Sequence, residues 1–339
     1  MPHTDLPETV NNQTLIDVQY LSINLNNQPI PLVDEISFQI NKGETLCLVG
    51  ESGCGKSLTA LALMGLLPEP TVKRTGGKAN FANRDLFALK KTDLRQIRGD
   101  QLAMIFQEPM TSLNPAHRIG DQITETILEH QTISKKAAIN KAVDLLDMVK
   151  IPNVKARFFA YPHELSGGMR QRIMIAIAMA NNPKLLIADE PTTALDVTVQ
   201  REILLLIKEL QKETETAVLF ITHDLGVVAT IADNVAVMYA GHIVESGDVA
   251  SVFHNPQHPY TLGLISAMPD IDQPKPVLPA INGIVPTVQN MPPGCRFSSR
   301  CPFAENACNL IVPPDLKRGE NHKVKCINTP LEENFIIQI

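Results

Sequence analysis

The chain has 339 residues, of which 44% are hydrophobic and 4% aromatic, with no tryptophan, and its formal net charge is −6. This length predicts two domains, or one large domain with an appendage. The acidic balance argues against nucleic acid as a partner. The apolar run at residues 173–180 is too short to cross a membrane, which takes about 20 residues.

The first residues, 1–14, are polar and lack the basic and then apolar pattern of a secretion signal. We therefore expect a flexible N-terminus and a reducing, cytoplasmic environment. In such an environment clustered cysteines bind metal more often than they form disulfides.

Short apolar segments alternate with helical patterns along the first 248 residues. Strands are expected within 15–49, where SINL, ISFQI and TLCLVG are separated by polar turns, and at 101–106, 183–191 and 217–224. Helices are expected at 57–67, 119–150 and 199–214, and a hairpin at 235–248 that turns at Ala240 and Gly241. Strands that alternate with long helices predict an α/β fold with a mainly parallel sheet.

A phosphate-binding motif, GESGCGKS, directly follows an apolar strand and opens an apolar helix. It fits G-x-x-x-x-G-K-[ST], in which glycines let successive backbone N–H groups point at phosphate and the helix N-terminus adds positive charge. Lys56 can reach the β- and γ-phosphates, and the Ser57 hydroxyl can ligate Mg²⁺. The residues of this loop are Gly50, Glu51, Ser52, Gly53, Cys54, Gly55, Lys56 and Ser57.

Two acids end the apolar segment LLIADE, so we expect Asp189 and Glu190 at the C-terminal edge of a buried strand. Ligands collect at this edge in open α/β sheets. Asp189 is suited to hold Mg²⁺, directly or through water, and Glu190 to orient or deprotonate an attacking water. A strand that ends in two acids is a weak signal alone, and the motif at 50–57 strengthens it.

Six motifs, taken in order, resemble the ATP-binding subunit of ABC transporters. They are GESGCGKS, Gln107 after QLAMIF, LSGGM, LLIADEP, ALD and His223 after AVLFIT. LSGGM differs from the commonest form of its motif, LSGGQ, only in the last residue. The resemblance spans about residues 15–265 and implies an ABC-type P-loop nucleotide-binding domain, with a mainly parallel sheet, an antiparallel β subdomain and a helical subdomain.

The LSGGM segment precedes a strongly helical run, RQRIMIAIAMA. Serine is a good helix cap and glycines expose backbone N–H groups, so the segment predicts an anion site at a helix N-terminus. The resemblance implies that this loop meets the ATP of a second nucleotide-binding domain in a head-to-tail dimer. Its residues are Ser166, Gly167, Gly168 and Met169.

The resemblance also assigns roles to single residues. Gln107 is implied to contact Mg²⁺ and the attacking water, and to head the helical subdomain, about 108–165, that docks on membrane subunits. His223 is implied to contact the γ-phosphate and to link it to Glu190, and Asp196 to cross the dimer. ATP and Mg²⁺ are the implied cofactors. The implied catalytic residues are Glu190, His223 and Gln107, and the implied magnesium ligands are Ser57, Gln107 and Asp189.

The family usually stacks adenine on an aromatic residue of an early strand. Leu25 occupies the expected place here, and Tyr20 lies five residues earlier. We therefore expect adenine to rest on an aliphatic surface.

The C-terminal part narrows the resemblance. HNPQHPYTLGLISAMP, at 254–269, and GCRFSSRCPFAENAC, at 294–308, resemble the C-terminal region of dipeptide and oligopeptide importer ATPases. This implies a peripheral subunit at the cytoplasmic face of the plasma membrane that hydrolyses ATP to energise peptide import. The implied partners are two integral membrane permeases, a second ATP-binding subunit and an extracytoplasmic peptide-binding protein. The expected domains are 15–268 for nucleotide binding and 269–339 for a C-terminal lobe.

Other functions stay open. Related importers carry nickel, heme precursors or glycosides on similar ATPases. Another class, ABC ATPases that act on DNA or ribosomes, usually has two nucleotide domains in one chain or a long coiled-coil insertion, and this sequence has neither. A third possibility is a redox protein, built on an ATPase, whose main function lies in the cysteine segment.

Four cysteines near the end of the chain have the spacing C-x5-C-x6-C-x17-C. Four thiolates can hold Zn²⁺ or a [4Fe–4S] cluster. The wide spacing favours a cluster, because structural zinc prefers tight pairs. The resemblance also implies a cluster, while zinc and free thiols remain alternatives. The four are Cys295, Cys301, Cys308 and Cys326.

Three further residues in or near these motifs have simpler expected roles. We expect Cys47 to be an inert core residue and Cys54 to be incidental to a loop that works through its backbone. His322 lies four residues before Cys326 and could replace a metal ligand, but a solvated histidine is the preferred interpretation. The metal centre is expected to be structural, since this segment has few apolar residues with which to form a core of its own.

Overall fold

The computed structural model describes residues 14–107, 112–193, 195–268 and 280–331. The predicted flexible stretch, 1–14, lies outside these ranges except for Thr14, which begins the first strand. The first part of the proline-rich stretch, residues 269–279, also lies outside them.

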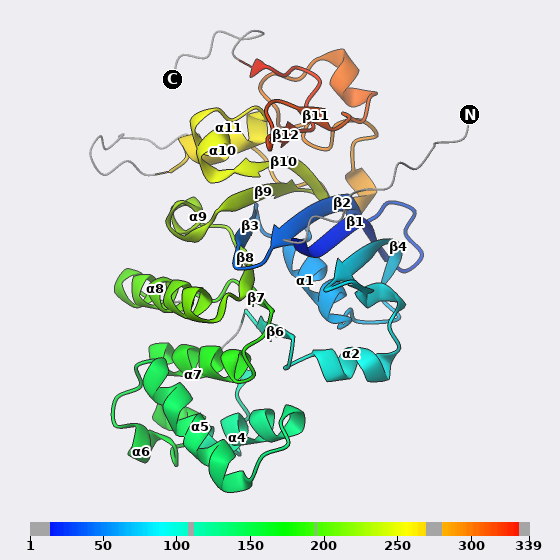
Figure 1. Ribbon diagram of the computed structural model, residues 1–339. Coiled ribbons are helices and arrows are strands. Elements are labelled where there is room, and N and C mark those ends of the chain that lie inside the picture. Colours follow the sequence, from blue (N-terminus) through cyan, green and yellow to red (C-terminus); the bar gives the residue numbers. More distant parts are fainter. Residues whose placement is uncertain (1–13, 108–111, 194, 269–279, 332–339) are drawn as a thin grey trace.

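Two sheets organise the described residues (Figure 1). The smaller is antiparallel, with strand order β2-β1-β4-β5, and the larger has the order β11-β12-β10-β9-β3-β8-β7-β6. In the larger sheet β9, β3, β8, β7 and β6 run parallel, whereas β10, β12 and β11 extend it antiparallel. The predicted fold class is therefore confirmed. The strands are β1 Thr14–Leu25, β2 Val33–Asn41, β3 Thr45–Val49, β4 Val72–Phe81, β5 Arg84–Asp85, β6 Leu102–Ile105, β7 Leu185–Asp189, β8 Ala217–Thr222, β9 Asn234–Tyr239, β10 His242–Asp248, β11 Leu316–Lys317 and β12 Lys323–Val324.

The larger sheet separates two hydrophobic cores. One lies between the sheet, α1 and the smaller sheet, and the other lies between the sheet and the later helices. Along β7, Leu185 and Ile187 enter the first core, while Leu186 and Ala188 enter the second. Both faces of the central strands are buried, which explains their unbroken apolar runs. The helices are α1 Lys56–Met64, α2 Lys91–Ile97, α4 Ile119–His130, α5 Lys135–Met148, α6 Val154–Arg157, α7 Gly167–Met179, α8 Val197–Thr214, α9 Leu225–Ile231, α10 Val249–His254 and α11 Pro259–Ser266.

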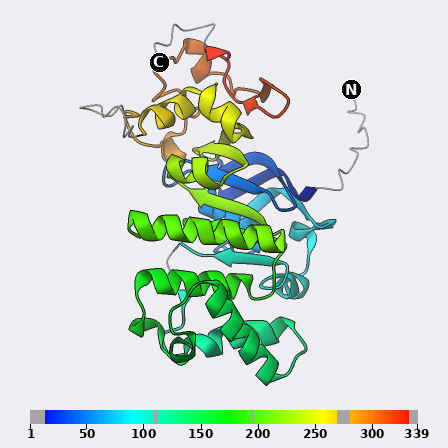
Figure 2. The ribbon, with the colours of Figure 1, turned by 60° about the vertical axis from the view of Figure 1, so that its left-hand side comes forward.

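The molecule has three tiers, which Figures 1 and 2 show from two sides. Helices α4 to α7 form the lower tier, the smaller sheet and the parallel strands of the larger sheet the middle one, and α10, α11, β11 and β12 the upper one. The predicted helical stretch 119–150 is two helices, because Ser134 caps the second by accepting a hydrogen bond from the Ala137 N–H.

The predicted hairpin at 235–248 is confirmed as β9 and β10. Its turn residues have positive φ angles, 44° at Ala240 and 87° at Gly241, which matches the right-handed twist of the two strands. Gly241 also lies close to other groups. A Cβ atom there would overlap the Leu32 carbonyl oxygen and approach the Arg296 guanidinium.

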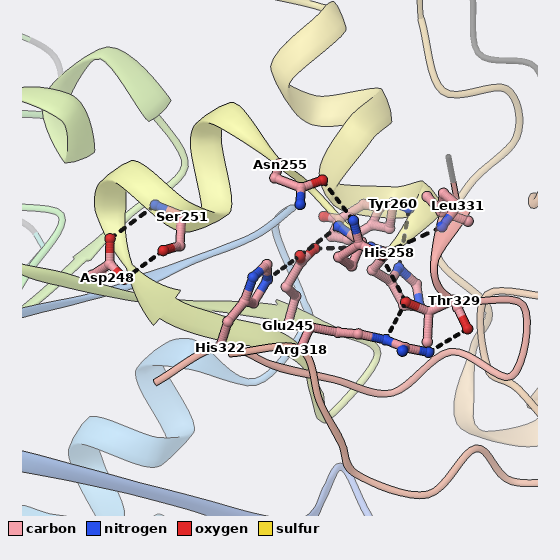
Figure 3. Close-up of polar contacts among 11 residues, drawn as sticks. Glu245, Asp248, Ser251, Asn255, His258, Tyr260, Arg318, His322, Thr329 and Leu331 are labelled. Carbon is pink, nitrogen blue, oxygen red and sulfur yellow. Dashed lines mark hydrogen bonds and ion pairs between the residues drawn. The ribbon is translucent and has the colours of Figure 1, made fainter. Parts of the chain in front are cut away.

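The C-terminal residues join the larger sheet, because β12 pairs with β10. Beside this pairing lies a buried carboxylate, Glu245, which accepts hydrogen bonds from the Gln257 N–H at 2.6 Å and the His258 N–H at 3.0 Å (Figure 3). The His322 ring contacts the same carboxylate at 2.7 Å. The expectation of a solvated His322 is therefore wrong. A fully buried carboxylate needs polar partners, and the histidine is one of them.

Apolar residues of the C-terminal segment pack on the main core. Phe297 is 2% exposed and lies against Tyr239 and Tyr260, with ring centroids 5.0 and 5.4 Å apart. The two tyrosines also contact each other, at 4.7 Å. This aromatic cluster gives the segment a hydrophobic anchor that its own composition does not supply.

The crowded turn at Gly241 generates the first prediction. Gly241→Ala combines a left-handed backbone with a steric overlap, and we expect it to lower the free energy of unfolding by about 3 kcal/mol. Gly283→Ala is the matched control, because Gly283 has a similar φ of 81° but only ordinary contacts around its Cβ position. Gly283→Ala should lower the free energy of unfolding by about 1 kcal/mol. Urea unfolding of the two variants measures both values, and equal losses would contradict the steric explanation.

Candidate nucleotide-binding site

The predicted phosphate loop and the predicted catalytic residues meet at one edge of the larger sheet. The loop 50–55 follows β3, His223 follows β8, Glu190 follows β7, and Gln107 lies just beyond β6. These strands are neighbours in the order β3-β8-β7-β6, and all of them run parallel. Their carboxyl ends therefore converge, as ligand sites in open α/β sheets require.

The glycines of the loop are needed for its conformation. Gly53 and Gly55 have φ angles of 81° and 107°, in the region that side chains disfavour. Gly50 packs so closely on the end of β9 that a Cβ atom would overlap the Met238 carbonyl oxygen. The loop thus enters α1 with a curled backbone that larger residues would not allow.

Lys56 closes this loop on itself. Its ammonium group donates to the Gly50 carbonyl oxygen at 2.7 Å and to the Glu51 carbonyl oxygen at 3.0 Å, and the residue is 5% exposed. A buried ammonium at the N-terminus of α1 makes the loop a site for an anion.

Oxygen atoms suited to Mg²⁺ lie beside the loop. The Ser57 hydroxyl donates to Asp189 Oδ1 at 3.1 Å. Burial raises the pKa of Asp189, and the hydrogen bond from Ser57 acts in the opposite direction. A hydroxyl and a carboxylate are the ligands that Mg²⁺ prefers, and a cation would compensate the buried charge of the carboxylate.

Glu190 makes several polar contacts at the site. Its carboxylate accepts hydrogen bonds from Gln107 at 3.2 Å and Thr193 at 2.9 Å, and it lies 3.2 Å from His223 Nδ1. Burial acts to raise the pKa of Glu190, but the hydrogen bonds from Thr193 and His223 outweigh it and lower the pKa. Its φ of 45° turns the chain at the strand end. The arrangement therefore holds an ionised carboxylate in a fixed position.

Thr193 is a contact of Glu190 that was not predicted from the sequence. Its position three residues after Glu190, within the turn that follows β7, is the signal that could have identified it. Its hydroxyl fixes one oxygen of the carboxylate while His223 contacts the other.

The segment 166–169 is not part of the cluster formed by the loop 50–57 and Glu190. Ser166 caps α7 by accepting from the Met169 N–H at 3.4 Å, as its residue type predicts, and Ser166 and Gly167 are exposed. Among the residues that the structure describes, no hydrogen bond or ion pair joins this segment to the loop 50–57. Gly168 contacts Val199 of α8, where a Cβ would be 2.9 Å from a methyl group.

In this structure Asp196 caps a helix, and the two residues considered for adenine contact, Leu25 and Tyr20, lie in β1. Asp196 caps α8, accepting from the Thr198 and Val199 N–H groups at 3.1 and 3.0 Å. Leu25 is half-buried at the end of β1, and Tyr20 is 66% exposed with a φ of 51°.

The four C-terminal cysteines line one cavity, together with Ser298. Burial raises the pKa of the Cys295 thiol. It also raises the pKa of Cys301 to about 12 and the pKa of Cys326 to about 11. The Ser298 hydroxyl is buried and has no hydrogen-bond partner among the residues that the structure describes. In the described part of the chain, no group of three or more His, Cys, Asp or Glu side chains is placed to hold a metal ion.

Comparisons with known proteins agree with the geometry. A family model for ABC transporters matches residues 33–193, and a model for the oligopeptide/dipeptide transporter C-terminal region matches residues 244–308. The oligopeptide transport ATP-binding protein AppD of Bacillus subtilis is 50% identical over 315 residues, which cover 92% of this chain and 96% of that protein. The dipeptide transport ATP-binding protein DppD of the same organism is 47% identical, with coverages of 93% and 94%.

Solved structures extend the comparison. The ATP-binding cassette MJ0796, in a dimeric post-hydrolysis state bound to ADP and phosphate, superimposes with a TM-score of 0.61 and 26% identity, covering 69% of this chain and 98% of the cassette. The fold and the site thus define an ABC-type ATPase. More narrowly, the chain belongs to the ABC transporter ATPases that carry the oligopeptide/dipeptide transporter C-terminal region.

Membership of this family implies membrane permeases and a substrate-binding protein as partners. Within the ranges that the structure describes, no helix combines the length and apolar character needed to span a bilayer.

The contacts of Glu190 generate the second prediction. Thr193→Val removes the hydroxyl that stabilises the carboxylate, so the pKa of Glu190 should rise. If Glu190 must be ionised for hydrolysis, the acid limb of the pH profile of ATP hydrolysis should move to higher pH. Thr230→Val is the control, because the Thr230 hydroxyl bonds only within α9, to the Gly226 carbonyl. An unmoved acid limb in Thr193→Val would contradict the role of this hydrogen bond.

Proposed function

We propose that the chain hydrolyses ATP to energise the import of dipeptides or oligopeptides through a membrane complex. The observation that carries the catalytic part is the convergence of four strand ends on Glu190 and the loop 50–57. The peptide class rests on the C-terminal region matched at 244–308 and on relatives named for peptide transport.

In this proposal the loop 50–57 cradles the phosphates and Lys56 pairs with the β- and γ-phosphates. Ser57, Asp189 and Gln107 would hold Mg²⁺, and the ion would supply positive charge that neutralises the phosphates. Glu190 orients or deprotonates the attacking water, and His223 links it to the γ-phosphate. The short contacts around Glu190 support this assignment, since a base must be ionised and fixed in position.

The segment 166–169 is proposed to serve the ATP of a second ATP-binding subunit, and Asp196 to contact that subunit. Two facts support this. Ser166 and Gly167 are exposed at the N-terminus of α7, where backbone N–H groups favour an anion. Within the described residues, the loop 50–57 of the same chain makes no polar contact with Ser166 or Gly167.

The remaining partners follow from the family. We propose two permeases, a peptide-binding protein outside the membrane, and a peripheral position on the cytoplasmic face. The helical subdomain, about 108–165, would dock on the permeases, and ATP-driven closure of the dimer would move it. We retain the division into a nucleotide-binding domain at 15–268 and a C-terminal lobe at 269–339.

The four cysteines are proposed to hold a [4Fe–4S] cluster with a structural role. Their common cavity and the unpartnered Ser298 hydroxyl beside them support this, because such a hydroxyl can donate to sulfur. Zinc is the alternative, and the wide spacing of the four cysteines in the sequence disfavours it, since structural zinc prefers tight pairs. When bound, the cluster would supply four covalent links that join distant parts of the segment.

The third prediction tests catalysis. Glu190→Gln keeps the size of the side chain but removes the base, so ATP binding should persist while hydrolysis falls by about 100-fold or more. Lys56→Ala should instead weaken ATP binding, by about tenfold or more. Fluorescent-nucleotide titration and phosphate release measure the two effects. Glu213→Gln, on the exposed end of α8, is the control, and normal hydrolysis by Glu190→Gln would refute the assignment.

The fourth prediction tests the cysteine segment. Protein purified without oxygen should be brown and contain iron and acid-labile sulfide, which Cys308→Ser should lose. Cys54→Ser, which changes a cysteine outside the cavity, should retain both. Colourless protein with one zinc per chain would overturn the cluster and leave the ATPase proposal intact.

A further inference from the structure

Glu51, the second residue of the phosphate loop, is held from three directions. Its backbone N–H donates to the Tyr260 hydroxyl at 2.9 Å, and its carbonyl oxygen accepts from Lys56 at 3.0 Å. Its carboxylate forms a two-pronged ion pair with Arg300, at 2.7 and 3.1 Å. Two of these three partners come from the C-terminal region, more than 200 residues away in the sequence.

The Arg300 guanidinium uses all three of its nitrogen atoms in hydrogen bonds. Nη1 bonds to Glu51 and the Tyr239 hydroxyl, Nη2 bonds to Glu51 and the Ile281 carbonyl, and Nε bonds to the Asn282 carbonyl. The side chain is 5% exposed. A guanidinium has five N–H donors in a planar fork, and each of them has an acceptor here. Lysine cannot reproduce this arrangement.

The elements that bring these partners to the loop are well anchored. His258 caps α11 by accepting from the Tyr260 N–H at 3.1 Å, which fixes the start of the helix that carries the tyrosine. Phe297, three residues before Arg300, packs on Tyr239 and Tyr260. The aromatic rings restrict water around the ion pair, which strengthens it.

The ion pair compensates the negative charge of Glu51 in the phosphate loop. Glu51 places a carboxylate, 29% exposed, in a loop whose ligand is a polyanion. An uncompensated negative charge there would repel the triphosphate, whereas the paired carboxylate does not. The pair also ties the backbone of the loop to the segment that contains Cys295 and Cys301.

We propose that Arg300 is a positioning residue for nucleotide binding: it neutralises Glu51 and fixes the phosphate loop, and thereby couples the cysteine segment to the ATP site. The inference rests on the proposed binding of ATP by residues 50–57. Coupling between two sites is reciprocal, so nucleotide must also order the cysteine segment.

The test compares Arg300→Gln, Glu51→Gln and the double variant in the full-length chain. Arg300→Gln should weaken Mg-ATP binding about tenfold, because Glu51 is left unpaired and negative. Adding Glu51→Gln to Arg300→Gln should restore the part of the lost affinity that comes from charge repulsion, because the unpaired carboxylate is then removed. A purely structural arginine would give no such rescue. Arg318→Gln is the matched control, because Arg318 bonds to Thr329 and not to the loop.

Hydrogen exchange gives a second readout. Mg-ATP should slow exchange across residues 295–301 in the unmodified chain and in Arg318→Gln, and the slowing should be lost in Arg300→Gln. The inference is overturned if folded Arg300→Gln binds ATP as tightly as the unmodified chain, or if the double variant binds no better than Arg300→Gln. If Arg300→Gln does not fold, the proposal is overturned when Mg-ATP leaves hydrogen exchange at residues 295–301 of the unmodified chain unchanged. Failure of the proposed function looks different: the unmodified chain would not bind Mg-ATP, or Lys56→Ala would bind it equally well.

Discussion

The parallel pairing of β3, β8, β7 and β6 is the constraint on which the site depends. Each strand is short and buried on both faces, so a shift in register would move polar end residues into the core. With the register fixed, the residues that follow the strands must meet. The loop 50–57, the adjacent acids Asp189 and Glu190, and His223 come from three distant parts of the sequence, and the sheet brings them together.

Much of this could be predicted from the sequence, because the strands and the motifs obey local rules. The apolar run before GESGCGKS and the acids after LLIA each indicate both a strand and its end, and Gly241 indicates the hairpin turn. The contact between Thr193 and Glu190 was not predicted, because it depends on how the chain turns after β7. Gln107 was predicted from the resemblance and does contact Glu190.

The C-terminal segment shows where local reasoning fails. Its composition indicates a poor core, yet Phe297 enters the main core and β12 extends the main sheet. His322 was expected in solvent because the sequence does not reveal that Glu245 is buried beside it. Tertiary contacts of this kind join residues that are distant in the sequence, such as His322 and Glu245, which are 77 positions apart, and no periodicity or spacing encodes them. The same long-range contacts place Arg300 and Tyr260 on the phosphate loop, so the segment touches the ATPase site as well as the end of the sheet.

The central claim is that one sheet edge binds and hydrolyses ATP. The most direct measurement is a structure of the assembled transport complex with Mg²⁺ and a non-hydrolysable ATP analogue. We expect that the γ-phosphate contacts Lys56, that Mg²⁺ contacts Ser57, and that Glu190 faces the side from which water attacks. A triphosphate bound away from this edge, or a Glu190 turned away from the γ-phosphate in every state of the complex, would contradict this claim.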